Sequence, residues 1–114
     1  MDATIEQKSF QFAVRIVNLY KYLRKEKKEF VLSKQLLRSG TSIGANVAEA
    51  QQAQSRADFI SKLSISLKEA AETNYWLRLL HATDYLDDAE FRSVHNDCRE
   101  LERILTSILK SARN

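Results

Sequence analysis

The fold is indicated first by one stretch of sequence, residues 91–112, which reads FRSVHNDCRELERILTSILKSA. Its apolar residues recur in alternating steps of three and four positions without a break: Phe91, Val94, Cys98, Leu101, Leu105, Ile108 and Ala112. Sustained three-four spacing places one apolar seam along an α-helix and is typical of helices that cross at about 20° in bundles. The stretch therefore predicts a bundle helix over residues 88–112.

The rest of the chain has too few turn residues for a β or α/β fold. Proline is absent and there are only two glycines among 114 residues, against an ordinary combined share of roughly 12%. Sheets need turn residues about every ten positions, whereas a few long helices joined by short loops need almost none. We therefore expect an all-α fold, an antiparallel up-down four-helix bundle that forms one domain over residues 1–114.

A wide apolar surface marks the first predicted helix, residues 4–25. Its apolar residues form two adjacent stripes at helical spacing: Phe10, Ala13, Val14 and Val17 in one, and Phe12, Ile16, Leu19 and Leu23 in the other. One small core needs a single face of each helix. We therefore expect this helix to contact more than one neighbour, with another subunit among the candidates.

Two glycines make the second predicted helix, residues 33–53, ambiguous. Gly40 and Gly44 each cost about 1 kcal/mol relative to alanine inside a helix, so their four-residue spacing indicates a strip where another backbone comes close. The competing interpretation is a break, with a loop over residues 39–42 and a new helix after it. We favour the continuous or kinked helix.

Polar residues that can accept hydrogen bonds from free backbone N–H groups mark the helix starts. Ser33 is the expected N-cap of the second helix. Ser55 and Asp58 form a capping box before the third helix, residues 56–82, and Asp87 is the expected N-cap of the fourth.

The chain shows no pattern that predicts catalysis or a metal site. Di-iron bundles use a glutamate three residues before a histidine, but arginines precede His81 and His95 at that spacing. Cys98 falls in the apolar seam, where burial raises the pKa of a thiol and leaves it unreactive. We therefore expect surface or interface histidines, no enzyme activity, no cofactor and no bound metal.

Glu49 and Glu69 fall beside the apolar stripes of their helices. A buried carboxylate must be paired or protonated, and two in one cleft could perform acid–base chemistry. We favour structural roles instead, as ion pairs or hydrogen bonds with Arg38, Asn46, Arg78 or a helix end that set the register between helices.

The most basic stretch, residues 21–28, reads KYLRKEKK and has five positive charges and one negative charge. Its cations are candidates for phosphate contacts: Lys21, Arg24, Lys25, Lys27 and Lys28. Tyr20 or Tyr22 is available to stack on unpaired bases. A lysine-rich solvated loop is the equal alternative.

The composition is that of a cytoplasmic protein without a membrane partner. No apolar run approaches the roughly 20 residues of a membrane span, and the first residues lack the basic-then-apolar order of a signal peptide. The single cysteine, Cys98, forms no intramolecular disulfide, which agrees with a reducing compartment.

Two blocks in the middle of the chain carry a recognisable motif. One runs from Gln35 to Glu49 and the other from Asp58 to Glu69. Together with the helical tail from Phe91, they resemble the bacterial four-helix-bundle family of 23S rRNA intervening-sequence proteins. The motif residues to which we assign structural roles are Arg38, Asn46, Glu49, Ser66 and Glu69.

This resemblance implies an up-down bundle that assembles as a ring-like homopentamer without established enzymatic activity. A related branch is similar to the accessory protein of diversity-generating retroelements, which binds nucleic acid and a reverse transcriptase. The leading hypothesis is a non-catalytic oligomeric accessory that presents basic surfaces to RNA or DNA, with a reverse transcriptase or another protein as a further partner. The alternative is a scaffold that binds a partner polypeptide and has no nucleic-acid role.

Overall fold

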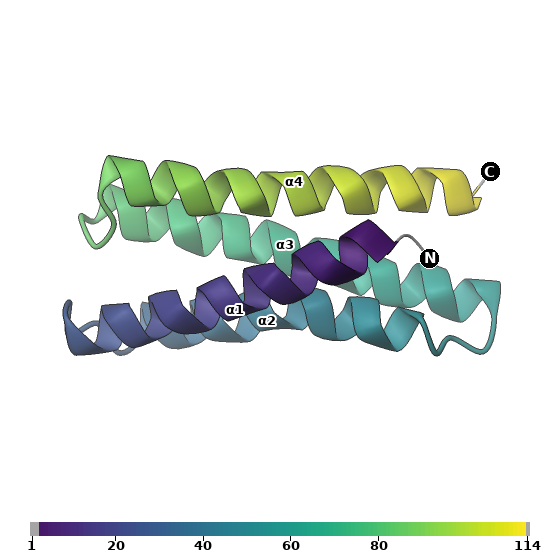
Figure 1. Ribbon diagram of the computed structural model, residues 1–114, viewed down its shortest axis with the longest axis horizontal. Helices are drawn as coiled ribbons and strands as arrows, with labels where there is room; N and C mark the ends of the chain where they lie inside the picture. Colours follow the sequence, from purple (N-terminus) through teal and green to yellow (C-terminus); the bar gives the residue numbers. More distant parts are fainter. Residues whose placement is uncertain (1–2, 114) are drawn as a thin grey trace.

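A computed structural model describes residues 3–113, nearly all of them helical and none in a strand. The helices are α1 (Ala3–Lys25), α2 (Leu32–Ala50), α3 (Arg56–Ala82) and α4 (Asp88–Arg113). They alternate in direction along a body of 44 × 20 × 19 Å (Figure 1). The predicted all-α fold with four helices is confirmed, while Met1, Asp2 and Asn114 of the expected 1–114 domain lie outside the described residues.

Each helix packs against its neighbours in chain order, and α1 also contacts α4. The α1–α4 contact is the least extensive of the four, because α1 is inclined across the front of the bundle (Figure 1). Among these helices, none combines the length and the apolar content that crossing a membrane requires.

One continuous apolar core runs through the bundle. It contains one of the two predicted stripes of α1 and the predicted seam of α4, whose Val94, Cys98 and Leu105 are fully buried. Leu109, which lies outside that seam spacing, is buried as well. Each fully buried leucine or isoleucine contributes about 1.5–3 kcal/mol relative to an exposed one, so this core holds the helices together.

Gly40 and Gly44 lie where α1 and α2 come closest. A Cβ added at Gly40 would stand 2.8 Å from Cγ2 of Ile16, and one at Gly44 would stand 3.1 Å from the carbonyl oxygen of Ser9. α2 is helical throughout this region. The continuous helix is therefore confirmed and the alternative of a break at residues 39–42 is wrong.

Small hydroxyl residues give α2 and α3 a similarly close contact. Ser66 Oγ donates to the carbonyl oxygen of Ile43 at 2.8 Å, and Thr73 Oγ1 donates to Ser39 Oγ at 2.9 Å. All three hydroxyl side chains are buried. Because each finds a partner, the helices approach without the cost of an unsatisfied polar group.

Two of the predicted helix caps are confirmed. The backbone N–H of Asp58 donates to Ser55 Oγ at 3.0 Å at the start of α3. The backbone N–H of Glu90 donates to Asp87 Oδ1 at 2.8 Å at the start of α4.

The predicted bounds of α2, residues 33–53, need correction at both ends. Ser33 is not the N-cap, because α2 begins at Leu32 and the carboxylate of Glu29 accepts the free backbone N–H groups in place of a capping hydroxyl. The helix ends at Ala50, where the next backbone N–H groups bond to carbonyls only three residues earlier and tighten the chain into a turn.

We expect Gly40→Ala to lower the free energy of unfolding by up to about 2 kcal/mol. Overpacking against Ile16 costs about 1–3 kcal/mol, and the gain of about 1 kcal/mol in helix propensity offsets only part of it. Urea denaturation measures the change. In an Ile16→Ala background the same substitution should become neutral or stabilising, and an equal loss in both backgrounds would contradict the close contact.

Candidate nucleic-acid interface

The basic segment, residues 21–28, forms the corner where α1 ends and the connection to α2 begins. Lys21, Lys25, Lys27 and Lys28 are exposed, and Arg24 is half-buried. Within residues 3–113, none of these five cations belongs to an ion pair. The corner thus presents positive charge that forms no ion pair with a carboxylate among residues 3–113.

Aromatic rings hold Arg24 in place. Its guanidinium lies 5.4 Å from the ring centroid of Tyr20 and 5.0 Å from that of Phe30. Such cation–π contacts contribute about 0.5–1 kcal/mol at exposed sites. Tyr20 is therefore already stacked within the chain, whereas Phe30 and the neighbouring Val31 still expose much of their surface.

Glu29 fixes the connection that follows. Its carboxylate accepts the backbone N–H groups of Val31, Leu32 and Ser33, the last at 2.7 Å. Burial alone would raise the pKa of this carboxyl, but the three backbone hydrogen bonds outweigh burial and lower it below the ordinary value. Lys28 takes a positive φ of 55° just before it, so the basic corner rests on a defined turn.

The opposite corner at the same end of the bundle is acidic (Figure 1). Asp84, Asp87 and Asp88 are exposed at the α3–α4 connection. Asp88 lies 2.7 Å from Nε2 of His81, and this hydrogen bond lowers the pKa of the Asp88 carboxyl. The α3–α4 connection is therefore acidic, in contrast to the basic corner on the α1–α2 side.

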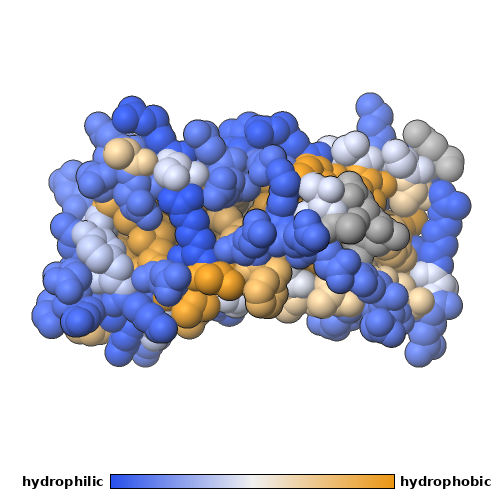
Figure 2. Space-filling model, in the orientation of Figure 1, coloured by the Kyte–Doolittle hydropathy of each residue, from blue (hydrophilic) through white to orange (hydrophobic). Residues whose placement is uncertain are grey.

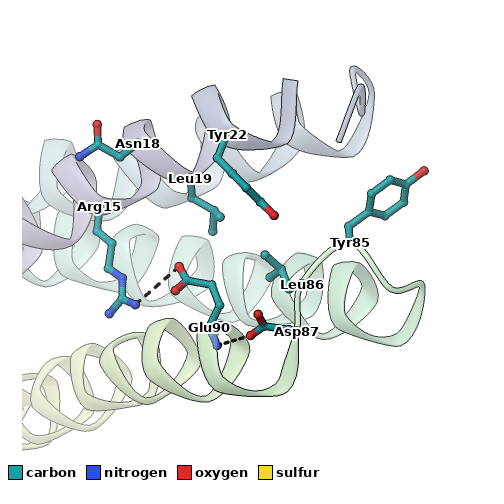
Figure 3. Close-up of a pocket in the computed structure, with 8 residues that line it drawn as sticks. All are labelled: Arg15, Asn18, Leu19, Tyr22, Tyr85, Leu86, Asp87 and Glu90. Carbon is teal, nitrogen blue, oxygen red and sulfur yellow. Dashed lines mark hydrogen bonds and ion pairs between the residues drawn. The ribbon is translucent and has the colours of Figure 1, made fainter. Parts of the chain in front are cut away.

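A cavity of about 380 Å³ separates the two corners. Figure 3 shows Tyr22 extending from α1 toward this gap, and Arg15, further along the same helix, directed at Glu90 of α4. Arg15 is held by Asp97 at 2.9 Å and by Glu90 at 3.7 Å. Because carboxylates already neutralise its one cation, this cavity is a poor phosphate site.

The motif residues Arg38 and Glu69 join α2 to α3. The Arg38 guanidinium contacts Glu69 at 3.1 Å and also pairs with Glu72. Glu72 in turn accepts a hydrogen bond from Nε1 of Trp76 at 2.9 Å, and Trp76 and Arg38 together lower the pKa of its carboxyl. This network joins α2 to α3 through the ion pair with Arg38 that the sequence suggested for Glu69.

Glu49 does not share that environment. It is exposed rather than buried beside the apolar stripe, and it pairs with Lys62 at 3.2 Å. Asn46 donates to the carbonyl oxygen of Ser42 in its own helix. Glu49 and Glu69 thus have separate partners and form no common acid–base site.

The described residues contain no group of three or more His, Cys, Asp or Glu side chains that could hold a metal ion. Cys98 is fully buried, and burial raises the pKa of its thiol to about 12. The prediction that Cys98 lies in the core is confirmed.

The predicted stripe of α1 that contains Phe10 and Val14 faces outward. Phe10 is 70% exposed and Val14 is 48% exposed. Beside them, a groove of about 700 Å³ between α1 and α2 is floored by Gly44, Ala45 and Ala48. Figure 2 shows apolar atoms gathered along this border of the two helices. We call Phe10, Val14 and this groove the α1 outer face.

Sequence reasoning overlooked three polar residues that organise these surfaces: Arg15, Glu29 and Glu72. Glu72 had a local signal, because it stands one helical turn after Glu69 and faces the same partner. The roles of Arg15 and Glu29 depend on contacts across a turn or between helices, which spacing alone does not reveal.

The family model of the 23S rRNA-intervening sequence protein matches residues 1–107. A solved structure, a protein of unknown function from the S23 ribosomal protein family of Bacteroides thetaiotaomicron, is 62% identical to this chain with a TM-score of 0.92. The alignment covers 93% of this chain and 98% of that one. No curated protein matches the chain.

We expect Glu29→Gln to destabilise the protein by about 0.5–2 kcal/mol at neutral pH, the usual cost of a lost helix cap. Because folding lowers the pKa of Glu29, its stabilisation is complete above the ordinary value of 4.5 and is lost as the pH falls through the folded value. Urea denaturation at about pH 7 and about pH 3 should show a larger difference from wild type at the higher pH. Glu26→Gln, an exposed carboxylate on the same corner, is the control. Equal stability of the two variants at neutral pH would refute the cap.

Proposed function

This chain belongs to the 23S rRNA-intervening sequence protein family, and we propose that it is a non-catalytic, homo-oligomeric accessory protein that presents basic surfaces to RNA or DNA in the cytoplasm. The observation that carries this proposal is the unneutralised basic corner formed by residues 21–28. Four exposed lysines and Arg24 project from a turn that Glu29 holds in shape. Preorganised cations bind phosphates without first breaking ion pairs within the protein.

The α1 outer face supports the oligomeric part of the proposal. A phenylalanine that is 70% exposed beside a small-residue groove favours burial against another surface. A ring forms when one surface of each subunit contacts a different surface of the next and the rotation closes. We propose a homopentamer, in which each added subunit brings a further copy of the basic corner.

Repetition of the corner would make binding strongly dependent on salt. Each phosphate neutralised on duplex DNA adds about 0.9 to the slope of log affinity against log salt concentration. Two contacts from each of five subunits would give ten, more than the five cations of a single corner can supply. Nucleic acid is thus a partner of the assembly in this proposal, and a reverse transcriptase or another protein is a further candidate partner.

A second candidate function is a scaffold whose α1 outer face holds a partner polypeptide, without a role for nucleic acid. The groove beside Phe10 favours it, because apolar grooves of this kind accept amphipathic helices. Under this alternative, the protein would bind no RNA even at low salt.

We expect substitution of Phe10 and Val14 by serine to reduce the assembly to monomers. Both side chains are exposed in the single chain, so the fold of the monomer should be retained. Sedimentation measures the mass, and helical content by circular dichroism measures the fold. Ile65→Ser, which removes an exposed apolar residue of α3, should leave the mass unchanged. An assembly that survives the double substitution would exclude the α1 outer face as the contact.

We expect reversal of two corner charges, Lys25→Glu with Lys28→Glu, to weaken binding to a structured RNA by at least about tenfold at low salt. The change moves the net charge from +3 by four units to −1. Lys62→Glu with Lys68→Glu on α3 makes the same change in net charge and should retain most of the affinity. Fluorescence anisotropy measures both. Equal binding by wild type and the corner variant would overturn the proposed role of this segment.

A further inference from the structure

The acidic and basic side chains of α4 lie on different sides of the helix. The helix has five acidic residues, and each has a polar partner at a flank of the helix: Asp88, Glu90, Asp97, Glu100 and Glu102. Toward α1, Glu100 pairs with Lys8 at 2.6 Å, while Arg15 takes Asp97 and Glu90. Toward α3, Glu102 accepts from Asn74 at 2.9 Å and Asp88 contacts His81. The acidic side chains of α4 thus interact with α1 on one flank of the helix and with α3 on the other.

The basic residues of α4 are left on its outer surface. Arg92, Arg99, Arg103 and Lys110 are all exposed and follow one another in steps of seven, four and seven residues. Those steps return to the same side of a helix, so the four cations form one row, the α4 row. At a rise of 1.5 Å per residue the row is about 27 Å long.

The α4 row has little internal neutralisation. Arg99 lies 3.8 Å from Glu102, at the outer limit for an ion pair. Arg92, Arg103 and Lys110 have no ion pair with any residue between 3 and 113. Three of the four cations of the row are therefore free of ion pairs within residues 3–113, on the outside of α4.

The position of the row separates it from the surfaces already assigned. α4 lies along the opposite edge of the bundle from α2 (Figure 1), and its row points away from the core seam. The α1 outer face and the basic corner belong to α1 and α2. The residues of the proposed subunit contact, Phe10 and Val14, are therefore distinct from those of the α4 row.

The chemistry of the row suits a sugar–phosphate backbone rather than unpaired bases. Arginine guanidinium groups contact phosphates through paired N–H donors. Binding of single strands relies instead on aromatic platforms, and the aromatic ring of α4, Phe91, is already stacked between His81 at 4.1 Å and His95 at 4.8 Å. We propose that the α4 row binds the phosphate backbone of base-paired nucleic acid. This inference rests on the nucleic-acid role proposed above and adds the surface and the form of the ligand.

The test compares Arg92→Gln with Arg103→Gln against Lys62→Gln with Lys68→Gln on α3. Each pair lowers the net charge from +3 by two units to +1, and neither arginine has an internal ion pair to lose. The probe is an RNA duplex of about 25 base pairs, roughly three times the row in length. The row variant should bind at least about tenfold more weakly at about 0.1 M salt, with a salt slope smaller by about 1.8 for two lost phosphate contacts. The α3 variant should bind like wild type, and thermal unfolding by circular dichroism checks that both pairs retain the fold.

The outcomes separate this inference from the function on which it rests. If wild type binds the duplex and the row variant binds equally well, or if both variants lose the same affinity, the α4 row is excluded while nucleic-acid binding stands. Equal affinity of wild type for the duplex and for one of its single strands would overturn the assignment to base-paired nucleic acid. If wild type binds neither probe at low salt, the proposed function fails and the inference falls with it.

Discussion

The close contact of α1 with α2 at Gly40 is the constraint on which the arrangement of the bundle depends. The space that a Cβ would need there is occupied by Ile16, so α1 can lie this near to α2 in only a narrow range of rotations. That rotation turns Ile16 and Leu23 into the core and leaves Phe10 and Val14 in solvent. The close contact of α1 with α2 therefore explains why Phe10 and Val14, the residues of the proposed assembly surface, are exposed.

The same rotation governs the electrostatics. With its apolar contacts committed mainly to α2, α1 meets α4 through Lys8 and Arg15, whose partners are carboxylates of α4. Exposed pairs of this kind contribute little stability each. Their larger effect is on charge distribution, because they remove negative potential from α4 and leave its arginines as the dominant outward charge. The chain has a modest net charge, yet its acidic residues on α4 lie at the contacts with neighbouring helices while the basic residues of that helix face solvent.

The fold was predictable where a pattern is repeated along one helix. The basic segment 21–28 was also visible in the sequence as a run of charge, but the contacts that shape the surfaces around it were not. The three-four spacing from Phe91 to Ala112 predicted α4, and side-chain caps at Ser55 and Asp87 located two helix starts. Ser33 was wrongly predicted as the N-cap of α2, because the carboxylate of Glu29, four residues earlier, accepts the free backbone N–H groups through a turn. The exposure of Glu49 was not predictable from its spacing, because a position beside an apolar stripe can still face solvent. The α4 row was overlooked because only the apolar half of the repeat was followed, although Arg92, Arg99 and Arg103 repeat with the same period.

The order of the helices also has a consequence for how quickly the chain reaches this structure. Three of the four helix–helix contacts join consecutive helices across connections of only a few residues. Most native contacts are therefore local in sequence, and the entropy lost in closing each loop is small. Domains with this low contact order fold in microseconds to milliseconds. Docking of α1 on α4 is the remaining pairing and the most distant in sequence. Consecutive helices can therefore pair as the chain emerges during synthesis, and α1 docks on α4 once the last helix is complete.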